Sequence, residues 1–437
     1  MSSIAIAGDT SGLVTIQAPA VAGTVVLTTP TASGTLLTTG SLIPIANGGT
    51  GSTSITFANL TTNVTGILPV ANGGTNLTAV GTSGNVLTSN GTTWVSSTPA
   101  VGGATLVRSA RTSNTILGTA DNSTLIDITS GTFSQTFTAA ATLGSGWFCY
   151  IRNAGTGDIT LDPNNSELID GLTSYIMYPS EVRLIQCTGT AFFSVVLTSF
   201  YKVFTASGTF TKPPGYQVFE GILWGGGGAG GSSTNMGFGG GGGAAVPFAL
   251  LASNIGASLG MTIGSGGTAT GQLGNTGGTS TLGSLFSAFG GGGGGTNEMA
   301  SYYPGGGGGA FSAGVATLPN AGAPTGSGFG GGGTTRVKSV YGGGGGGPGG
   351  IASSPGGSSI YGGGGGGTKA DNVTSNLGGV STFGGSGGAS KSGDYPDATP
   401  AQAGTAPGGG GGGGGGIWEA ATGGDGARGE LRIWGIV

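Results

Sequence analysis

The sequence predicts an all-β protein in which a trimeric fibrous β shaft leads to a β-sandwich-like module and then to a glycine-rich C-terminal domain. Three observations support this fold class. Short runs of alternating apolar and polar residues, separated by Gly, Pro, Asn and Ser, recur along the chain and are typical of strands. An eight-residue motif is repeated after 25 residues. Of the 106 glycines, 24 precede residue 201 and the other 82 follow it.

The first 103 residues are expected to form an N-terminal β segment, 1–40, and a shaft, 41–103. Within the shaft, Ile43-Pro-Ile-Ala-Asn-Gly-Gly-Thr50 returns as Leu68-Pro-Val-Ala-Asn-Gly-Gly-Thr75, and a fixed period indicates stacked supersecondary units. Asn90-Gly91 suits the tight turn of a hairpin. These repeats hold few bulky apolar side chains, so one chain alone would bury almost no core. We therefore expect three parallel chains around a shared axis, a homotrimer.

Residues 104–200 have an ordinary composition and are expected to form a β-sandwich or barrel. Strand-like segments follow one another every 8–12 residues with Gly, Asn and Pro between them. The expected strands are 125–129, 132–138, 147–152, 158–161, 175–178, 182–187 and 191–197. Cys149 and Cys187 lie in two of them, and we expect buried free thiols rather than a disulfide.

Residues 201–437 are organised by eight runs of four or more glycines. The runs are 225–228, 239–243, 290–295, 305–309, 330–333, 342–347, 362–367 and 408–416. A flexible linker is one interpretation. The other is a bundle of polyglycine II helices, extended three-fold helices that pack closely because they lack Cβ atoms. Residues 201–224 and 424–434 alternate like half-buried strands, and a linker needs no such strands at its two ends. We therefore expect an ordered domain of packed polyglycine II helices between β-strands.

Several of these motifs resemble bacteriophage tail fibre proteins. LPVANGGT and GNVLTSNGTTW resemble fibre-shaft repeats, and GLVTIQAPAVAGTVVLTTP resembles the opening of such proteins. VFEGILWGGGGAGG and GGDGARGELRIW are similar to the boundaries of the glycine-rich domain that ends some fibres. The resemblance implies a homotrimeric virion protein that is assembled in the host cytoplasm. Its N-terminal region would attach to the tail, the baseplate or another fibre protein, and its tip would bind a host polysaccharide or outer-membrane protein.

Composition argues against several other classes of function. Charged residues make up 6% of the chain and the net charge is −4, so there is no basic footprint for nucleic acid. The chain contains no histidine, which removes histidine-based triads and the commonest zinc sites. No apolar run approaches the 18 residues of a membrane span, and we expect neither a span nor a signal peptide.

The one carboxylate cluster consists of Asp158, Asp162, Glu167 and Asp170. It could form a glycosidase pair or bind Ca²⁺, but Asp-Pro and Asn-Asn beside it favour solvated turns. We therefore expect no enzymatic activity, no cofactor and no metal. A tailspike-like depolymerase and a purely structural fibre or whisker are the alternatives.

The loops between glycine runs are the expected receptor-binding elements, because loops on a rigid framework usually carry binding residues. If the first and last strands pair, ten crossings of the bundle gather five loops at one end. These loops are 232–238, 296–304, 334–341, 368–383 and 417–422. The candidate receptor-binding residues in them are Tyr302, Tyr303, Arg336, Lys338, Lys369 and Trp418. We expect Tyr341 and Tyr361, which directly precede glycine runs, to cap the bundle instead. Loops 310–329 and 389–407 are the alternative binding loops.

Overall fold

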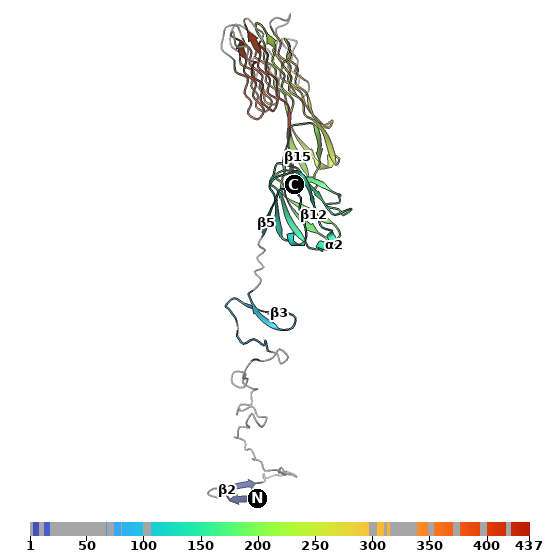
Figure 1. The fold of residues 1–437 in the computed structure, drawn as a ribbon, viewed down its shortest axis with the longest axis vertical. Coiled ribbons are helices and arrows are strands. Elements are labelled where there is room, and N and C mark those ends of the chain that lie inside the picture. The colour runs from blue at the N-terminus through green and yellow to red at the C-terminus, as the bar shows by residue number, and fades with distance from the viewer. Residues whose placement is uncertain are drawn as a thin grey trace. The chain divides into compact units, whose positions relative to one another are not determined.

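The fold is taken from a computed structural model, shown in Figure 1. It describes residues 3–7, 13–17, 67, 74–79, 81–98, 106–296, 304–309, 313–314, 339–347, 354–369, 376–393, 400–416 and 421–437. The chain divides into two compact units, Met1–Ala104 and Thr105–Val437. The described elements are almost all strands, which confirms the predicted all-β class.

The first unit contains two short antiparallel pairs. Strand β1 (Ser3–Ala7) pairs with β2 (Leu13–Gln17), and β3 (Val86–Ser89) pairs with β4 (Trp94–Ser97). The β3–β4 turn confirms the hairpin expected at Asn90-Gly91, since the Asn90 side chain accepts the backbone N–H of Thr92 and Thr93 at 3.0 and 2.7 Å. The repeated motif at 43–50 and most of its copy at 68–75 lie outside the described residues.

The second unit begins with a two-sheet β module. Its larger sheet has the order β12-β11-β8-β6-β5, in which β5, β6 and β8 run parallel and β8, β11 and β12 run antiparallel. Its smaller sheet has the order β10-β9-β7. The strands are β5 (Val107–Arg111), β6 (Thr124–Ile128), β7 (Phe133–Thr136), β8 (Phe148–Asn153), β9 (Ile159–Asp162), β10 (Tyr175–Met177), β11 (Val182–Cys187) and β12 (Phe192–Thr198). Short helices η3 (Thr119–Asp121) and α2 (Ala140–Leu143) complete the module.

The two sheets enclose one apolar core. Ile126 and Ile151 from the larger sheet and Leu161 and Met177 from the smaller one are fully buried in the same cluster. All seven predicted strands are confirmed, and β5 is the strand that the sequence analysis missed. Cys149 and Cys187 are buried free thiols on β8 and β11, and burial raises the pKa of the Cys149 thiol far above its ordinary value.

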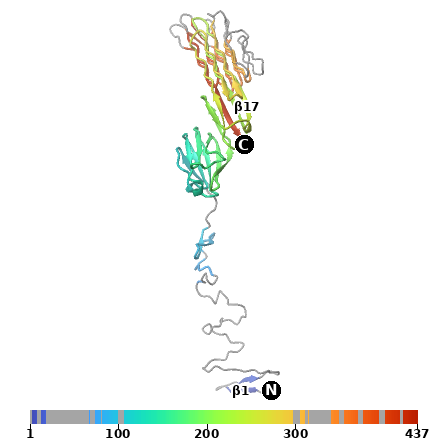
Figure 2. The ribbon, with the colours of Figure 1, turned by 90° about the vertical axis from the view of Figure 1, so that its right-hand side faces the viewer.

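A second pair of sheets connects the β module to the glycine-rich region (Figure 2). One sheet contains β13 (Tyr201–Phe204), β23 (Glu430–Ile436), β15 (Val218–Trp224) and β17 (Ala245–Leu251), all antiparallel. The other contains β14 (Gly208–Thr211), β18 (Ser258–Thr262), β19 (Ser280–Leu282) and β20 (Phe286–Ala288), with η4 (Ala252–Asn254) nearby in sequence. The strands that flank the glycine runs therefore pair directly, as expected, with Trp224 opposite Glu430.

The glycine runs lie side by side and hydrogen-bond to one another rather than to themselves. In the run 239–243, three successive N–H groups donate to three different runs, and the fourth N–H group donates to the same run as the first. The four distances are 2.7 to 2.9 Å. The pairs are Gly240 to Gly411, Gly241 to Gly292, Gly242 to Gly344 and Gly243 to Gly408. The carbonyls of the same residues accept from three further runs, through Gly366, Gly228, Gly308 and Gly363. The hydrogen-bonding direction thus repeats every three residues, and one run contacts six neighbours.

This packing leaves no room for side chains inside the bundle. A Cβ added to Gly240, Gly241 or Gly344 would overlap a carbonyl oxygen of a neighbouring run. Glycine is therefore required here for close backbone approach. In the described part of the bundle, backbone hydrogen bonds take the place that apolar side chains have in an ordinary core.

Candidate functional site

The glycine bundle has two ends, which we name by what lies there. The sheet end is where Trp224, Ala245 and Glu430 continue into β15, β17 and β23. The loop end is the opposite end, where β16 (Ser232–Ser233) and β21 (Lys391–Gly393) pair in parallel with β22 (Gly414–Gly416).

Parts of four predicted binding loops meet at the loop end. Gly237 bridges Thr296, and Ser233 bridges Ala421. The N–H of Lys369 donates to the carbonyl of Gly237 at 3.3 Å. The described residues of loop 232–238, the first residues of loops 296–304 and 368–383, and the end of loop 417–422 therefore come together as expected.

The predicted count of ten crossings is wrong, and the error changes the end of the bundle at which Tyr341 is expected. Segments with spaced glycines also cross the bundle: the N–H of Gly277 donates to Gly291 at 2.8 Å, and that of Gly356 to Leu377 at 3.1 Å. The count of ten includes the eight uninterrupted runs and the interrupted segments 384–388 and 423–429, but not these further segments. As a result Tyr341, the last residue of loop 334–341, lies at the sheet end, where its carbonyl accepts the N–H of Ala245 at 2.7 Å.

The structure places one of the six candidate receptor-binding residues. Lys369 is 1% exposed, and its Nζ donates to the carbonyl of Gly415 at 3.1 Å. This lysine is therefore enclosed by the loop end rather than presented on its surface, contrary to the expectation. The other five candidates lie outside the described residues: Tyr302, Tyr303, Arg336, Lys338 and Trp418. Thr296 lies at the loop end, whereas Ser339, which follows Lys338, lies at the sheet end.

Three stacked rings at the sheet end form what we call the aromatic ladder. Tyr341 stacks on Tyr361 with ring centroids 5.0 Å apart, and Tyr361 stacks on Phe383 at 4.8 Å. Each ring belongs to the third residue of a Ser-x-aromatic-Gly motif. The serines of the three motifs, Ser339, Ser359 and Ser381, are joined by parallel β-bridges. This confirms that Tyr341 and Tyr361 pack against the bundle. The repeated motif, which was visible in the sequence, was the signal for the ladder.

Hydrogen bonds fix the ladder to the glycine runs and to the sheet. Ser359 Oγ donates to the carbonyl of Gly342 at 2.8 Å, and Ser381 Oγ donates to that of Gly362 at 2.6 Å. The indole Nε1 of Trp224, which is itself fully buried, donates to the carbonyl of Tyr361 at 2.6 Å. The ring positions are thus set by the framework.

An open groove of about 400 Å³ lies between the aromatic ladder and the sheet, and we call it the ladder groove. Its lining residues are Glu220, Gly221, Ile222, Pro247, Phe248, Ala249, Tyr341, Tyr361 and Trp434. Trp434 Nε1 donates to Glu220 Oε2 at 3.3 Å, and the Trp434 ring stacks on Tyr201 with centroids 6.5 Å apart. The groove could not be predicted from the sequence, because its lining residues lie in segments that are far apart along the chain.

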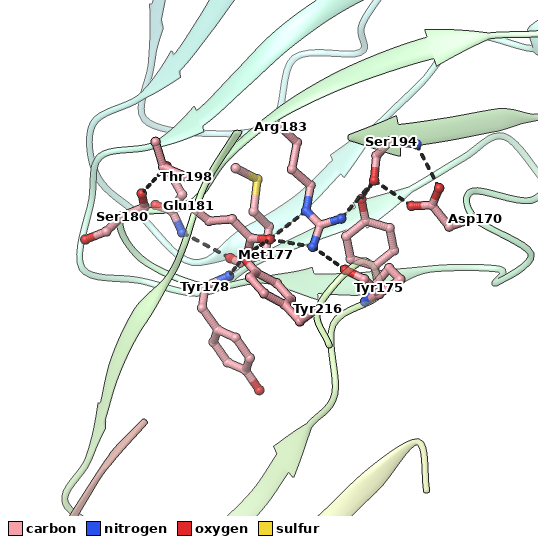
Figure 3. A network of polar contacts seen from close by, with 12 residues as sticks. Asp170, Tyr175, Met177, Tyr178, Ser180, Glu181, Arg183, Ser194, Thr198 and Tyr216 are labelled. Atoms are coloured by element: carbon pink, nitrogen blue, oxygen red, sulfur yellow. Dashed lines mark hydrogen bonds and ion pairs between the residues drawn. The ribbon is translucent and has the colours of Figure 1, made fainter. Parts of the chain in front are cut away.

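A buried polar network joins the β module to the glycine-rich region, as Figure 3 shows. Glu181 and Arg183 are both fully buried, and Arg183 Nε donates to Glu181 Oε1 at 2.6 Å. Tyr216 OH also donates to Glu181 Oε1, at 2.9 Å, and Arg183 Nη2 donates to the carbonyl of Pro214 at 2.8 Å. Burial raises the pKa of Glu181, although Arg183 and Tyr216 oppose this shift. Because these groups satisfy one another, the network serves to hold the two parts together.

Three members of the predicted carboxylate cluster have contacts within the fold. Asp158 pairs with Lys202 at 2.5 Å, Asp170 accepts Ser194 Oγ at 2.6 Å, and Glu167 accepts the N–H of Ala140 at 3.0 Å. Over the residues that the structure describes, no group of three or more His, Cys, Asp or Glu side chains could hold a metal ion.

Comparison with known families supports the glycine-rich assignment. The family model of a glycine-rich domain matches residues 205–434, which is slightly more than half of the 437 residues. None of the curated proteins matches the chain. Within the described part of the chain, no helix has the length and apolar character to cross a membrane.

Proposed function

The chain belongs to the glycine-rich domain family, and we propose that it is the receptor-binding fibre protein of a bacteriophage tail, which attaches the virion to the surface of its bacterial host. The shaft-like repeats at 43–50 and 68–75 and the opening sequence of the chain support this assignment. Residues 1–40 would attach to the tail, the baseplate or another fibre protein, and the protein would be assembled in the host cytoplasm.

The single observation that carries the proposal is the construction of the glycine bundle. Its runs bond to one another through their backbones and present no side chains. Such a framework is rigid but chemically uniform, so recognition would depend on the loops that join its segments. Described residues of four of these loops meet at the loop end. A fixed display of loops is what a receptor-binding tip requires.

We also propose that the glycine runs are polyglycine II helices. The three-residue repeat of their hydrogen-bond directions supports this, because polyproline II-like helices have three residues per turn and no internal hydrogen bonds. Each helix would be held by its neighbours, so the bundle would form as one cooperative unit.

The fibre would act as a homotrimer. The outer side of β12 supports this proposal, because Phe193, Val195 and Leu197 are 40, 45 and 49% exposed on one face of the strand. An apolar strip of this kind suits burial against a second copy of the chain. Three chains, and several fibres per virion, would add weak contacts into avid adhesion through effective concentration.

The proposed mechanism is reversible adhesion without catalysis. The contacts of Asp158, Glu167 and Asp170 within the fold favour this over a depolymerase. The test is saturable binding of the labelled full chain to a panel of bacteria and to matched strains that lack surface polysaccharide or a major outer-membrane protein. We expect binding to one host group that is lost with its receptor. A folded chain that binds no strain would contradict adhesion and favour a purely structural fibre.

A further inference from the structure

We propose that the ladder groove binds a saccharide unit of the host surface, with uncharged or amino sugars accepted and acidic sugars rejected. This inference places a second recognition surface at the sheet end, away from the loop end. It rests on the proposed function because adhesion to a host would bring the groove close to surface glycans. The class of sugar is inferred from the residues of the groove alone.

The ladder groove has the size and shape of a small-ligand site. Its volume of about 400 Å³ falls within the range of about 300–1,000 Å³ that is usual for small-ligand sites. Its floor is the outer side of the sheet, where Ile222 is half-buried and Pro247 and Ala249 are exposed. Its wall is the aromatic ladder, in which Tyr341 is 37% exposed. The space holds one or two sugar rings.

The ladder groove combines flat apolar surface with polar groups. Trp434 and the tyrosines supply flat apolar surface, which suits the C–H faces of a pyranose ring, together with polar groups at their edges. Among the described residues, no protein group hydrogen-bonds to the hydroxyls of Tyr341 and Tyr361, and Glu220 Oε1 likewise has no partner. These three groups can exchange hydrogen bonds with sugar hydroxyls. A purely hydrocarbon ligand would leave them unpaired, which is costly.

The charge of the ladder groove distinguishes between classes of sugar. Glu220 is the one charged residue among those that line the groove. Nearby Arg432 lies over the Trp224 ring at 4.8 Å and pairs with Glu430 at 2.7 Å, a carboxylate that Arg428 also contacts at 3.1 Å. The lining of the groove therefore carries one negative charge, that of Glu220, which disfavours a uronic or sialic acid beside it and tolerates a hexose or a protonated amino sugar.

The framework pre-organises the site. The ladder serines and the Trp224 indole hold the ring backbones in place, and the Trp434 indole orients Glu220. Little conformational freedom remains to be lost on binding, which favours affinity in an open site.

The experiment uses the full chain and three hexasaccharides of equal length: neutral maltohexaose, cationic chitosan hexamer and anionic hexagalacturonate. Titration calorimetry and saturation-transfer NMR should detect the neutral or the cationic hexamer, and the anionic one should bind at least about tenfold more weakly. The double variant Tyr341→Phe/Tyr361→Phe keeps the stacked rings and removes both hydroxyls. It should weaken binding about tenfold or more, whereas Tyr201→Phe, outside the groove, should change nothing.

Glu220→Gln provides a readout that a merely structural role would not change. It should reduce the discrimination against hexagalacturonate, because the repelling charge is gone. The proposal is overturned if neither the neutral nor the cationic hexamer binds, if the anionic hexamer binds equally well, or if Tyr341→Phe/Tyr361→Phe binds like the parent. A chain that binds cells but no hexamer refutes the groove and leaves adhesion standing, and the reverse result refutes adhesion alone.

Discussion

Replacing Gly344 by alanine tests whether the glycine runs form a hydrogen-bonded core. A Cβ at this position would overlap the carbonyl of Gly357 and approach the N–H of Gly365, so the run must move by roughly 1.5 Å to reach ordinary contact distances. That movement strains two hydrogen bonds of 2.8 Å, from Gly344 N to Gly363 and from Gly242 N to Gly344. Overpacking costs about 1–3 kcal/mol and each lost bond about 1 kcal/mol, which gives a destabilisation of roughly 3–5 kcal/mol.

The matched control is Gly271→Ala, because a Cβ there meets no atom within 4 Å. Alanine at a compatible site stabilises by about 0.4–1 kcal/mol through the unfolded chain, so the control should melt at or slightly above the parent temperature. Scanning calorimetry and limited proteolysis of the full chain make the comparison. If Gly344→Ala melts like Gly271→Ala and resists protease equally, the runs are not a packed core.

Three further predictions concern the ion pairs and the assembly. Arg183→Met should destabilise the protein by about 3–5 kcal/mol because it leaves Glu181 buried without its partner. The double variant Arg183→Met/Glu181→Gln should recover much of this lost stability. An unchanged melting temperature for Arg183→Met alone would argue against the network. Arg152 and Arg108 hold the pKa of Asp127 below its usual value. The ionised carboxylate therefore contributes stability above the unfolded pKa of about 3.9, and this contribution is lost as the pH falls through the lower, folded pKa. The Asp127→Asn variant should show a smaller fall in melting temperature on acidification than the parent, and an equal fall would be evidence against this assignment. Mass photometry should give three times 41.3 kDa for the intact protein, Val195→Glu on β12 should lower that mass, and a folded monomer of the parent chain would exclude the homotrimer.

Much of the fold could be predicted because its signals are local. Strands such as 147–152 and 182–187 alternate apolar and polar residues, which is sufficient to place them. Strand β5 was missed because Val107–Arg111 is mostly polar: Arg108 lies over the buried carboxylate of Asp127 rather than in solvent alone. The pairing of β15 with β23 followed from matching patterns at the two ends of the glycine-rich region.

The arrangement within the bundle was harder to predict because its contacts are backbone contacts between distant segments. Residues 354–358 and 376–380 cross the bundle although each segment has only two glycines, with larger residues on both sides of them. A side chain is tolerated wherever it points out of the bundle. This altered the count of crossings and moved Tyr341 to the sheet end. Lys369 was misplaced for a related reason, because its charge is held by the Gly415 carbonyl, a partner that carries no sequence signal.

Adsorption to host cells tests the central claim, that a rigid glycine bundle presents receptor-binding loops, most directly. The triple variant Tyr302→Ala/Tyr303→Ala/Trp418→Ala should be compared with the parent chain and with Tyr201→Phe. All three proteins should first be shown to have the same melting temperature. We predict that the triple variant no longer adsorbs while both others do. Undiminished adsorption of the correctly folded triple variant would contradict recognition through these loops.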